Sequence, residues 1–175
     1  SEKVRNTALL ALLELSQRLV DRLSSEVREP ALVALLLGKS AQAHERGIEF
    51  TVTVDSQLPS DTSHLPLTGQ EMVTVLGNLI DNAMDACDRD EPWIEVTVRC
   101  EPGTELLLRV ADSGSGMGPE TFENAMRRGY STKSTPGHGL GLALVAQVVK
   151  RHGGVLSSDV SYGSVVSVTI PAASA

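Results

Sequence analysis

Three short stretches of this chain combine glycines with polar residues that could bind a flat, charged ligand. The first is Asp112-Ser113-Gly114-Ser115-Gly116-Met117-Gly118, which follows the apolar residues 106–111. Its carboxylate stands where a strand is expected to end, and its glycines allow the backbone to approach a ligand closely. An ordinary glycine-rich turn has the same pattern, so this stretch alone is a weak signal.

The second stretch is the polar side of a helix that the spacing predicts over residues 69–88. Asn78, Asn82 and Asp85 fall on one face of this helix, and Asp81 lies beside them. Because asparagine is a poor helix former, the pattern opposes local propensity and indicates a functional site. A solvated polar face is the alternative interpretation. The amide oxygen of Asn82 would suit Mg²⁺, which takes few protein oxygens beside substrate phosphates.

The third stretch, Gly137-His138-Gly139-Leu140-Gly141-Leu142, runs directly into an apolar helix that is expected to end near His152. Glycines at a helix start leave free backbone N–H groups at the positive end of the helix dipole, which favours phosphate binding. The stretch is not a Walker loop, because no Gly-Lys-Ser/Thr follows it, and it does not match a dinucleotide fingerprint. Before it, residues 129–137 contain Thr132 and Lys133 without apolar periodicity, which predicts a loop of the lid kind.

Together the three stretches suggest one ligand. A polyanion bound to an acidic chain of formal net charge −7 needs local positive charge. Mg²⁺ on Asn82, the ammonium group of Lys133 and the helix start at Gly139 could supply it. Asp112 could accept a hydrogen bond from an exocyclic amine, which points to adenine, and Gly114 would let the ring lie against the backbone.

The remaining sequence predicts the elements that must position these stretches. Helices are expected over 1–25, from Pro30 to 46 and from Pro119 to 127, and the connection near Pro30 is short enough for a helical hairpin. Apolar and polar residues alternate over 48–54, and the runs 93–99 with 105–112 and 155–160 with 165–170 predict two β-hairpins. Thr68 and Glu71 have the spacing of a capping box for the helix that follows. The buried face of that helix is expected to comprise Met72, Val75, Leu76, Leu79, Ala83 and Cys87.

The first helix has more leucines than one buried face requires. Leu9, Leu12, Leu13 and Leu19 follow the helical spacing, and Leu10 and Leu15 widen the apolar surface. Two packing helices and a dimerisation stalk are both compatible with this pattern.

Composition excludes several classes of protein. The acidic balance argues against a nucleic-acid surface, and Cys87 and Cys100 lack the spacing of a zinc site or a disulfide framework. No apolar run approaches about 18 residues, so no membrane span is expected in this stretch of chain. We expect a cytoplasmic domain, with its helical start indicating a fragment of a larger membrane protein.

At this point the motifs resemble those of a known family. Asn78-Leu79-Ile80-Asp81-Asn82-Ala83 resembles the N box of the ATP-binding domain of sensor histidine kinases, and the stretches beginning at Asp112 and Gly137 resemble its G1 and G2 boxes. The residues 35–39 and 130–133 resemble the branch that senses citrate and C4-dicarboxylates. The resemblance implies an α+β fold, a two-layer α/β sandwich of the Bergerat type with helices on one face of a mixed sheet. A helical hairpin over 1–47 would precede the ATP-binding domain over 48–175.

The resemblance also implies roles for individual residues. It implies adenine recognition by Asp112, Mg²⁺ binding by Asn82, and catalytic phosphate contacts from Asn78 and Lys133. The full nucleotide-binding set implied is Asn78, Asn82, Asp85, Asp112, Gly114, Gly116, Met117, Thr132, Lys133, Gly137, His138, Gly139, Leu140, Gly141 and Leu142. In ATP-hydrolysing relatives a glutamate at the position of Asn78 acts as general base. Because asparagine cannot take a proton, phosphoryl transfer to another acceptor is favoured over hydrolysis.

The chain departs from the family pattern at the phosphoacceptor. Its histidines are His44, His64, His138 and His152, and none lies in the first 25 residues, where the acceptor is expected. We therefore expect the acceptor upstream, or lost. The implied partners are ATP, a phosphoacceptor helix, a response regulator and a second copy of the chain. An ATPase, a serine kinase of the same superfamily and a non-catalytic nucleotide-binding module remain alternatives.

Overall fold

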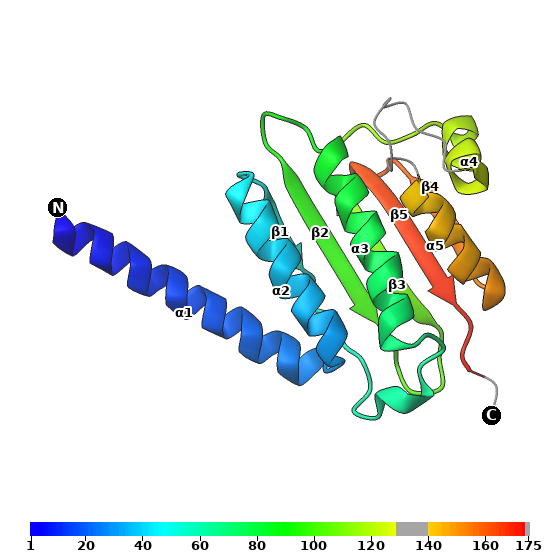
Figure 1. Ribbon diagram of the computed structural model, residues 1–175, viewed down its shortest axis with the longest axis horizontal. Coiled ribbons are helices and arrows are strands. Elements are labelled where there is room, and N and C mark those ends of the chain that lie inside the picture. The colour runs from blue at the N-terminus through cyan, green and yellow to red at the C-terminus, as the bar shows by residue number, and fades with distance from the viewer. Residues whose placement is uncertain (129–139, 174–175) are drawn as a thin grey trace.

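The computed structural model describes residues 1–128 and 140–173, which form a five-stranded sheet and one layer of helices (Figure 1). The helices are α1 (Glu2–Glu26), α2 (Pro30–Glu45), α3 (Gly69–Ala86), α4 (Pro119–Arg128) and α5 (Leu140–Arg151), with a 3-10 turn over Thr62–His64. The strands are β1 (Glu49–Val52), β2 (Trp93–Arg99), β3 (Leu106–Asp112), β4 (Val155–Asp159) and β5 (Ser164–Ile170). The predicted α+β sandwich is thereby confirmed.

The sheet has the order β1-β2-β3-β5-β4. β1 pairs with β2 in parallel, and every other neighbouring pair is antiparallel, so both predicted hairpins are present. In this register Asp112 lies opposite Ile94 of β2 and Ser164 of β5. The end of β3 is therefore held between two neighbouring strands.

Helices α2, α3 and α5 lie side by side over one face of the sheet (Figure 1). Their inward side chains, such as Leu36, Leu76 and Val145, join the inward side chains of the strands in one hydrophobic core. This layer places the N-terminal end of α5 beside α3, which brings the second and third sequence stretches together.

Helix α3 begins at the predicted capping box. The Glu71 backbone N–H donates to the Thr68 hydroxyl at 3.1 Å, and the Thr68 backbone N–H donates to Glu71 Oε1 at 3.0 Å. The predicted buried face is present with one exception, because the helix ends at Ala86 and Cys87 is its half-buried C-cap residue. Ile80 and Met84 are buried as well.

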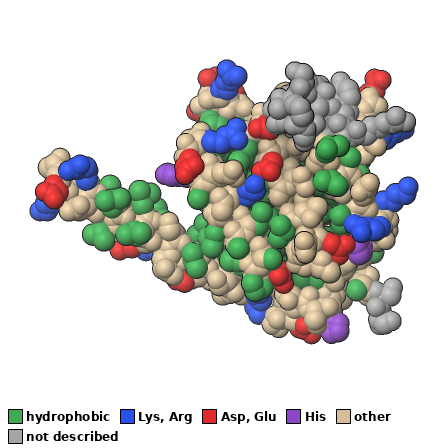
Figure 2. All heavy atoms as spheres, viewed as in Figure 1, with side chains coloured by type: hydrophobic (Ala, Val, Ile, Leu, Met, Phe, Trp, Pro, Cys, Tyr) green, Lys and Arg blue, Asp and Glu red, His purple; other side chains and the backbone are tan. Residues whose placement is uncertain are grey.

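The two N-terminal helices are present but differ in burial. Leu32, Leu36 and Ala43 of α2 belong to the core of the sandwich. Helix α1 projects from the body (Figure 1), and Figure 2 shows a row of hydrophobic side chains along it. Its only fully buried side chain is Leu23, near its C-terminal end. The domain boundary at residue 47 stays a prediction.

None of the helices in residues 1–128 and 140–173 has both the length and the apolar content that crossing a membrane requires.

Candidate nucleotide-binding site

A cavity of about 280 Å³ lies between α3, the end of β3, the start of β5 and the start of α5. Five of the predicted site residues line it, namely Asn82, Asp112, Gly116, Met117 and Leu142. Its other walls come from Leu79, Ala83, Ala86, Val110, Ser115, Ser164 and Val166. Apolar walls with one carboxylate and one amide suit a flat ring that carries a hydrogen-bond donor.

A larger cavity, of about 440 Å³, lies at the opposite end of the β2–β3 hairpin, among Pro59, Pro66, Pro102 and neighbouring loop residues. None of the predicted site residues lines it. The smaller cavity is therefore the candidate site, because it contains the residues with suitable chemistry.

Asp112 is the central polar group of the cavity. Its side chain is almost completely buried, and its Oδ1 accepts a hydrogen bond of 2.6 Å from the Gly114 backbone N–H. Burial raises the pKa of the Asp112 carboxyl above the usual aspartate value, although the Gly114 hydrogen bond acts in the opposite direction. Within the described part of the chain no hydrogen bond to Oδ2 is formed, so this oxygen can accept a hydrogen bond from a ligand.

Two glycines let the backbone pack tightly around Asp112. A side chain at Gly114 would overlap the Ala86 carbonyl oxygen, and one at Gly163 would overlap the carbonyl oxygen of Asp112 itself. Gly163 also has a positive φ of 60°, which favours glycine. These positions cannot accept a larger residue without moving Asp112.

The strand ends behind Asp112 are tied together through Ser113. Its hydroxyl accepts hydrogen bonds from the backbone N–H groups of Asp88, at 3.1 Å, and Trp93, at 3.2 Å. Its own backbone N–H donates to the Trp93 carbonyl at 3.1 Å. The Trp93 ring packs on Tyr162, with 4.9 Å between the ring centroids. This arrangement fixes the end of β3, which carries Asp112, to the start of β2.

The asparagines of α3 face the cavity and α5. Asn82 is exposed at the cavity wall. Asn78 Nδ2 donates to the Thr74 carbonyl at 2.6 Å, and Asn78 Oδ1 lies so close to Gly141 that a side chain there would meet it at 2.7 Å. Gly141 therefore allows α5 to approach α3 at Asn78.

The aspartates of α3 turn toward α2. Asp81 Oδ1 lies 2.6 Å from Lys39 Nζ, and Asp85 Oδ1 lies 3.7 Å from Arg46 Nη2. Asp85 does not line the cavity, so its predicted contact with a nucleotide stays a prediction.

The other predicted residues divide into described and undescribed positions. Leu140 is exposed at the start of α5, and Leu142 is buried. Thr132, Lys133, Gly137, His138 and Gly139 lie outside the described residues, so the predicted phosphate loop and lid remain sequence predictions.

Sequence reasoning missed several residues that line the cavity. Ser164 is the clearest, because β5 places it directly opposite Asp112 in the sheet register and beside Gly116. Its only signal was its position after the turn at Tyr162-Gly163. That signal identifies a site residue only when the pairing of β5 with β3 is known.

The described histidines are not in an acceptor-like setting at the cavity. His44 and His64 are exposed, and His152 Nε2 lies 2.6 Å from Glu71 Oε2. His152 thereby connects the end of α5 to the first turn of α3. No group of three or more His, Cys, Asp or Glu side chains that could hold a metal occurs within the described ranges.

The mixed sheet, its single helical layer and the buried aspartate beside a helix rich in asparagine define an ATPase-type nucleotide-binding domain. The chain belongs to the family described as histidine kinase-, DNA gyrase B-, and HSP90-like ATPase, whose model matches residues 68–174. The predicted family is thereby confirmed.

Curated relatives also confirm the predicted branch. The chain is 34% identical over 151 residues to a probable C4-dicarboxylate sensor kinase of Halalkalibacterium halodurans, covering 83% of this chain and 28% of the relative. It is 30% identical over 167 residues to the sensor histidine kinase CitA of Klebsiella pneumoniae, covering 90% of this chain and 29% of the relative. The chain thus spans less than a third of the length of these relatives.

Solved structures show the same fold. Full-length ShkA in complex with AMPPNP is 27% identical with a TM-score of 0.64, covering 84% of this chain and 30% of that one. The mycobacterial sensor histidine kinase MprB is 24% identical with a TM-score of 0.60, covering 82% of this chain and 97% of that one.

Proposed function

We propose that this chain binds ATP with Mg²⁺ and provides the γ-phosphoryl group that a sensor histidine kinase transfers to a histidine, for relay to a response regulator. The observation that carries the proposal is Asp112, a buried carboxylate with one oxygen held by Gly114 and the other available to the cavity. An adenine amine would donate to that second oxygen. The apolar wall of Leu79, Val110 and Leu142 would contact the ring.

Asn82 would hold the metal. Its side chain is exposed beside the cavity, and an amide oxygen on a helix fits a Mg²⁺ ion that keeps most of its other ligands as water and phosphate oxygens. When bound, Mg²⁺ would neutralise charge on the phosphates during transfer.

Asn78 supports transfer over hydrolysis. Its amide donates to the Thr74 carbonyl and cannot remove a proton from water. We infer that the γ-phosphoryl group passes to an acceptor side chain outside the cavity and not to water. Lys133, from the sequence motif, would contact the phosphates.

The acceptor and the remaining partners are part of the same proposal. The exposed leucines of α1 would pair with a second copy of the chain, and the acceptor histidine would lie on a helix outside residues 1–175. The chain would then act as the cytoplasmic ATP-binding part of a membrane-bound bacterial sensor.

The decisive experiment is calorimetric titration of ATP, with and without Mg²⁺, into the parent and Asp112→Asn. In the variant the single amide oxygen of the new asparagine would accept the hydrogen bond from the Gly114 backbone N–H. The side-chain NH₂ group would then face the adenine amine, and two donors cannot form a hydrogen bond. We expect ATP affinity to fall roughly ten- to hundredfold, the range for losing a charged hydrogen bond. Asp90→Asn, an exposed aspartate in a neighbouring loop, removes the same charge and should bind like the parent.

Equal affinity of Asp112→Asn and parent would contradict the adenine assignment. If the parent binds Mg²⁺–ATP, radiolabelled ATP with a supplied acceptor helix separates the alternatives. Transfer to histidine supports the kinase, steady release of ADP without transfer supports an ATPase, and neither supports a non-catalytic binding module.

A further inference from the structure

Helix α1 is attached to the rest of the molecule only through its last turns. Leu19 is partly buried and Leu23 is fully buried, whereas Val4 and Leu9 expose more than half of their surface. Figure 1 shows α1 leaving the body from its C-terminal end. The direction of the whole helix therefore depends on the contacts of these few residues.

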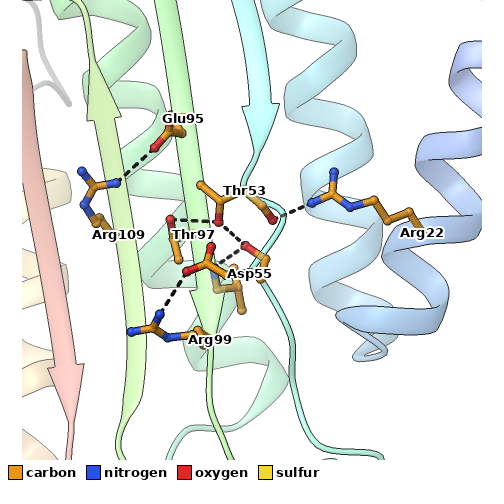
Figure 3. Close-up of polar contacts among 9 residues, drawn as sticks. Arg22, Thr53, Asp55, Glu95, Thr97, Arg99 and Arg109 are labelled. Atoms are coloured by element: carbon orange, nitrogen blue, oxygen red, sulfur yellow. Dashed lines mark hydrogen bonds and ion pairs between the residues drawn. The ribbon is translucent and has the colours of Figure 1, made fainter. Parts of the chain in front are cut away.

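Arg22 makes the principal polar contact at this attachment. Its Nη2 donates to the carbonyl oxygen of Thr53 at 2.5 Å (Figure 3). The same nitrogen donates to the Val52 carbonyl oxygen at 2.7 Å, and Arg22 Nε lies 3.3 Å from Glu26 Oε2. β1 is an edge strand that pairs only with β2, so an unpaired carbonyl at its outer side needs another donor. Arg22 thus joins α1 to the sheet through backbone atoms.

Thr53, the residue that follows β1, is itself held firmly. Thr53 Oγ1 hydrogen-bonds Ser56 Oγ at 2.8 Å and donates to Thr97 Oγ1 at 3.1 Å, and the Thr53 backbone N–H donates to the Val96 carbonyl at 2.9 Å (Figure 3). The carbonyls that Arg22 binds are therefore fixed relative to β2. Because Arg22 donates to these carbonyls, its side chain is also held in place relative to β2.

The exit from α1 is also defined. The backbone N–H groups of Val27 and Arg28 both donate to the Leu23 carbonyl, and Arg28 adopts a φ of 71°, which is unusual for a residue with a side chain. The Leu58 backbone N–H donates to the Glu26 carbonyl at 2.9 Å. These contacts hold the turn after α1 in one conformation. Arg22 adds a second attachment of α1 to the body, through the carbonyls of Val52 and Thr53.

We propose that Arg22 is a positioning residue that fixes the direction of α1 relative to the ATP-binding body by bridging to the free edge of β1. Arg22 does not contact the nucleotide cavity, so it acts through the placement of α1. The effect of Arg22 on phosphoryl transfer rests on the function proposed above. There α1 pairs with a second copy of the chain, so the direction of α1 would set the position of that copy's acceptor histidine relative to Asp112.

The test compares Arg22→Met with Arg18→Gln. Methionine keeps the unbranched apolar stem and removes the guanidinium, whereas Arg18 is an exposed arginine one turn earlier on α1. Spin labels at Ser16 with Ala41, and at Ser16 with Arg151, report the direction of α1 by pulsed electron resonance, and all three positions are exposed. Cys87 and Cys100 are replaced by alanine in all variants.

We expect one narrow distance distribution for the parent and Arg18→Gln, and loss of that single distance in Arg22→Met. Arg22→Lys, whose ammonium group can donate to the same carbonyls, should recover it. A narrow, unshifted distribution in Arg22→Met, or equal broadening in Arg18→Gln, would overturn the proposal. If Arg22→Met does not fold, Arg22→Gln serves with the same expectations.

ATP titration of the same variants separates this proposal from the proposed function. Arg22→Met should bind ATP like the parent, because the cavity is unchanged. Loss of ATP affinity together with the broadened distance would overturn the assignment of a positioning role in favour of a general structural one. Absence of ATP binding in every variant, including the parent, would contradict the proposed function and leave the distance measurement valid.

Discussion

Burial of Asp112 makes its ionised form costly, yet an ionised oxygen is what the proposed adenine contact needs. The raised pKa of this carboxyl records that cost. A functional residue that opposes folding in this way is expected to be replaceable with a gain in stability.

We therefore predict that Asp112→Asn unfolds at a higher denaturant concentration at neutral pH. The pKa of the parent carboxyl is higher in the folded than in the unfolded state, so stability falls as pH rises from the unfolded pKa through the folded pKa. Asparagine does not titrate, so the advantage of the variant should grow over that acidic window and stay constant above it.

Urea unfolding of parent, Asp112→Asn and Asp90→Asn at a series of pH values measures this difference. An advantage that shrinks with rising pH would contradict the prediction.

At the same scale, short sequence patterns were enough to predict that Asp112 and Asn82 share one site, and both line the cavity. Ser164 and Gly163 could not be predicted as site residues. They reach Asp112 only through the pairing of β5 with β3, which no local pattern encodes.

At the level of elements, the approach of α5 to α3 depends on the absence of a side chain at Gly141. Gly141→Ala would place a methyl group against Asn78 Oδ1. We expect a loss of about 1–3 kcal/mol in the free energy of unfolding, from overpacking, together with weaker ATP binding.

Gly38→Ala is the matched control for Gly141→Ala. Gly38 lies within α2, and nothing lies within 4 Å of the position that its Cβ would take. The same substitution there should stabilise the protein by up to about 1 kcal/mol, because alanine is the better helix former. Thermal unfolding distinguishes the two, and equal changes would contradict the role of Gly141.

Glu71 connects the first turn of α3 to the end of α5. Burial tends to raise the pKa of its carboxyl, but hydrogen bonds from Thr68 and His152 outweigh this effect and lower it. Glu71 thus contributes stability that is present above its unfolded pKa and lost as pH falls through its folded pKa.

We predict that Glu71→Gln lowers the free energy of unfolding near neutral pH by less than about 1 kcal/mol, since the contact between Glu71 and His152 is partly exposed. The difference from the parent should disappear on acidification. Glu91→Gln, an exposed glutamate, is the control in the same urea titration. A difference that persists at acidic pH would indicate a packing effect instead.

Element boundaries followed the sequence closely because each helix and hairpin has a local period or cap, as α3 has at Thr68 and Glu71. The strand order, in contrast, could not be predicted from local sequence patterns. The parallel pairing of β1 with β2 joins segments on either side of α3, so it depends on tertiary packing.

At the scale of the whole molecule, helix α1 exposes a run of leucines, namely Leu9, Leu10, Leu12, Leu13 and Leu15. Helices that expose such a surface commonly bind another surface. We predict that Leu9→Gln combined with Leu13→Gln converts a dimer into a monomer, whereas Glu14→Gln on the same helix does not.

Sedimentation velocity over a range of concentrations measures this change. A parent chain that stays monomeric throughout would contradict pairing through α1. The leucine pattern itself was evident in the sequence, but the direction of α1 was not. Arg22 sets it through the backbone carbonyls of Val52 and Thr53, which have no sequence signature.

The attachment of β2 to the end of β3 at Asp112 and Ser113 has a practical consequence. Trp93 is the only tryptophan of the chain, and its backbone contacts Ser113 while its ring contacts Tyr162 beside Gly163. Its intrinsic fluorescence therefore originates immediately behind the strand end that carries Asp112. We therefore expect occupation of the cavity to change this emission, which would report binding in unlabelled protein without a dye or a modified nucleotide.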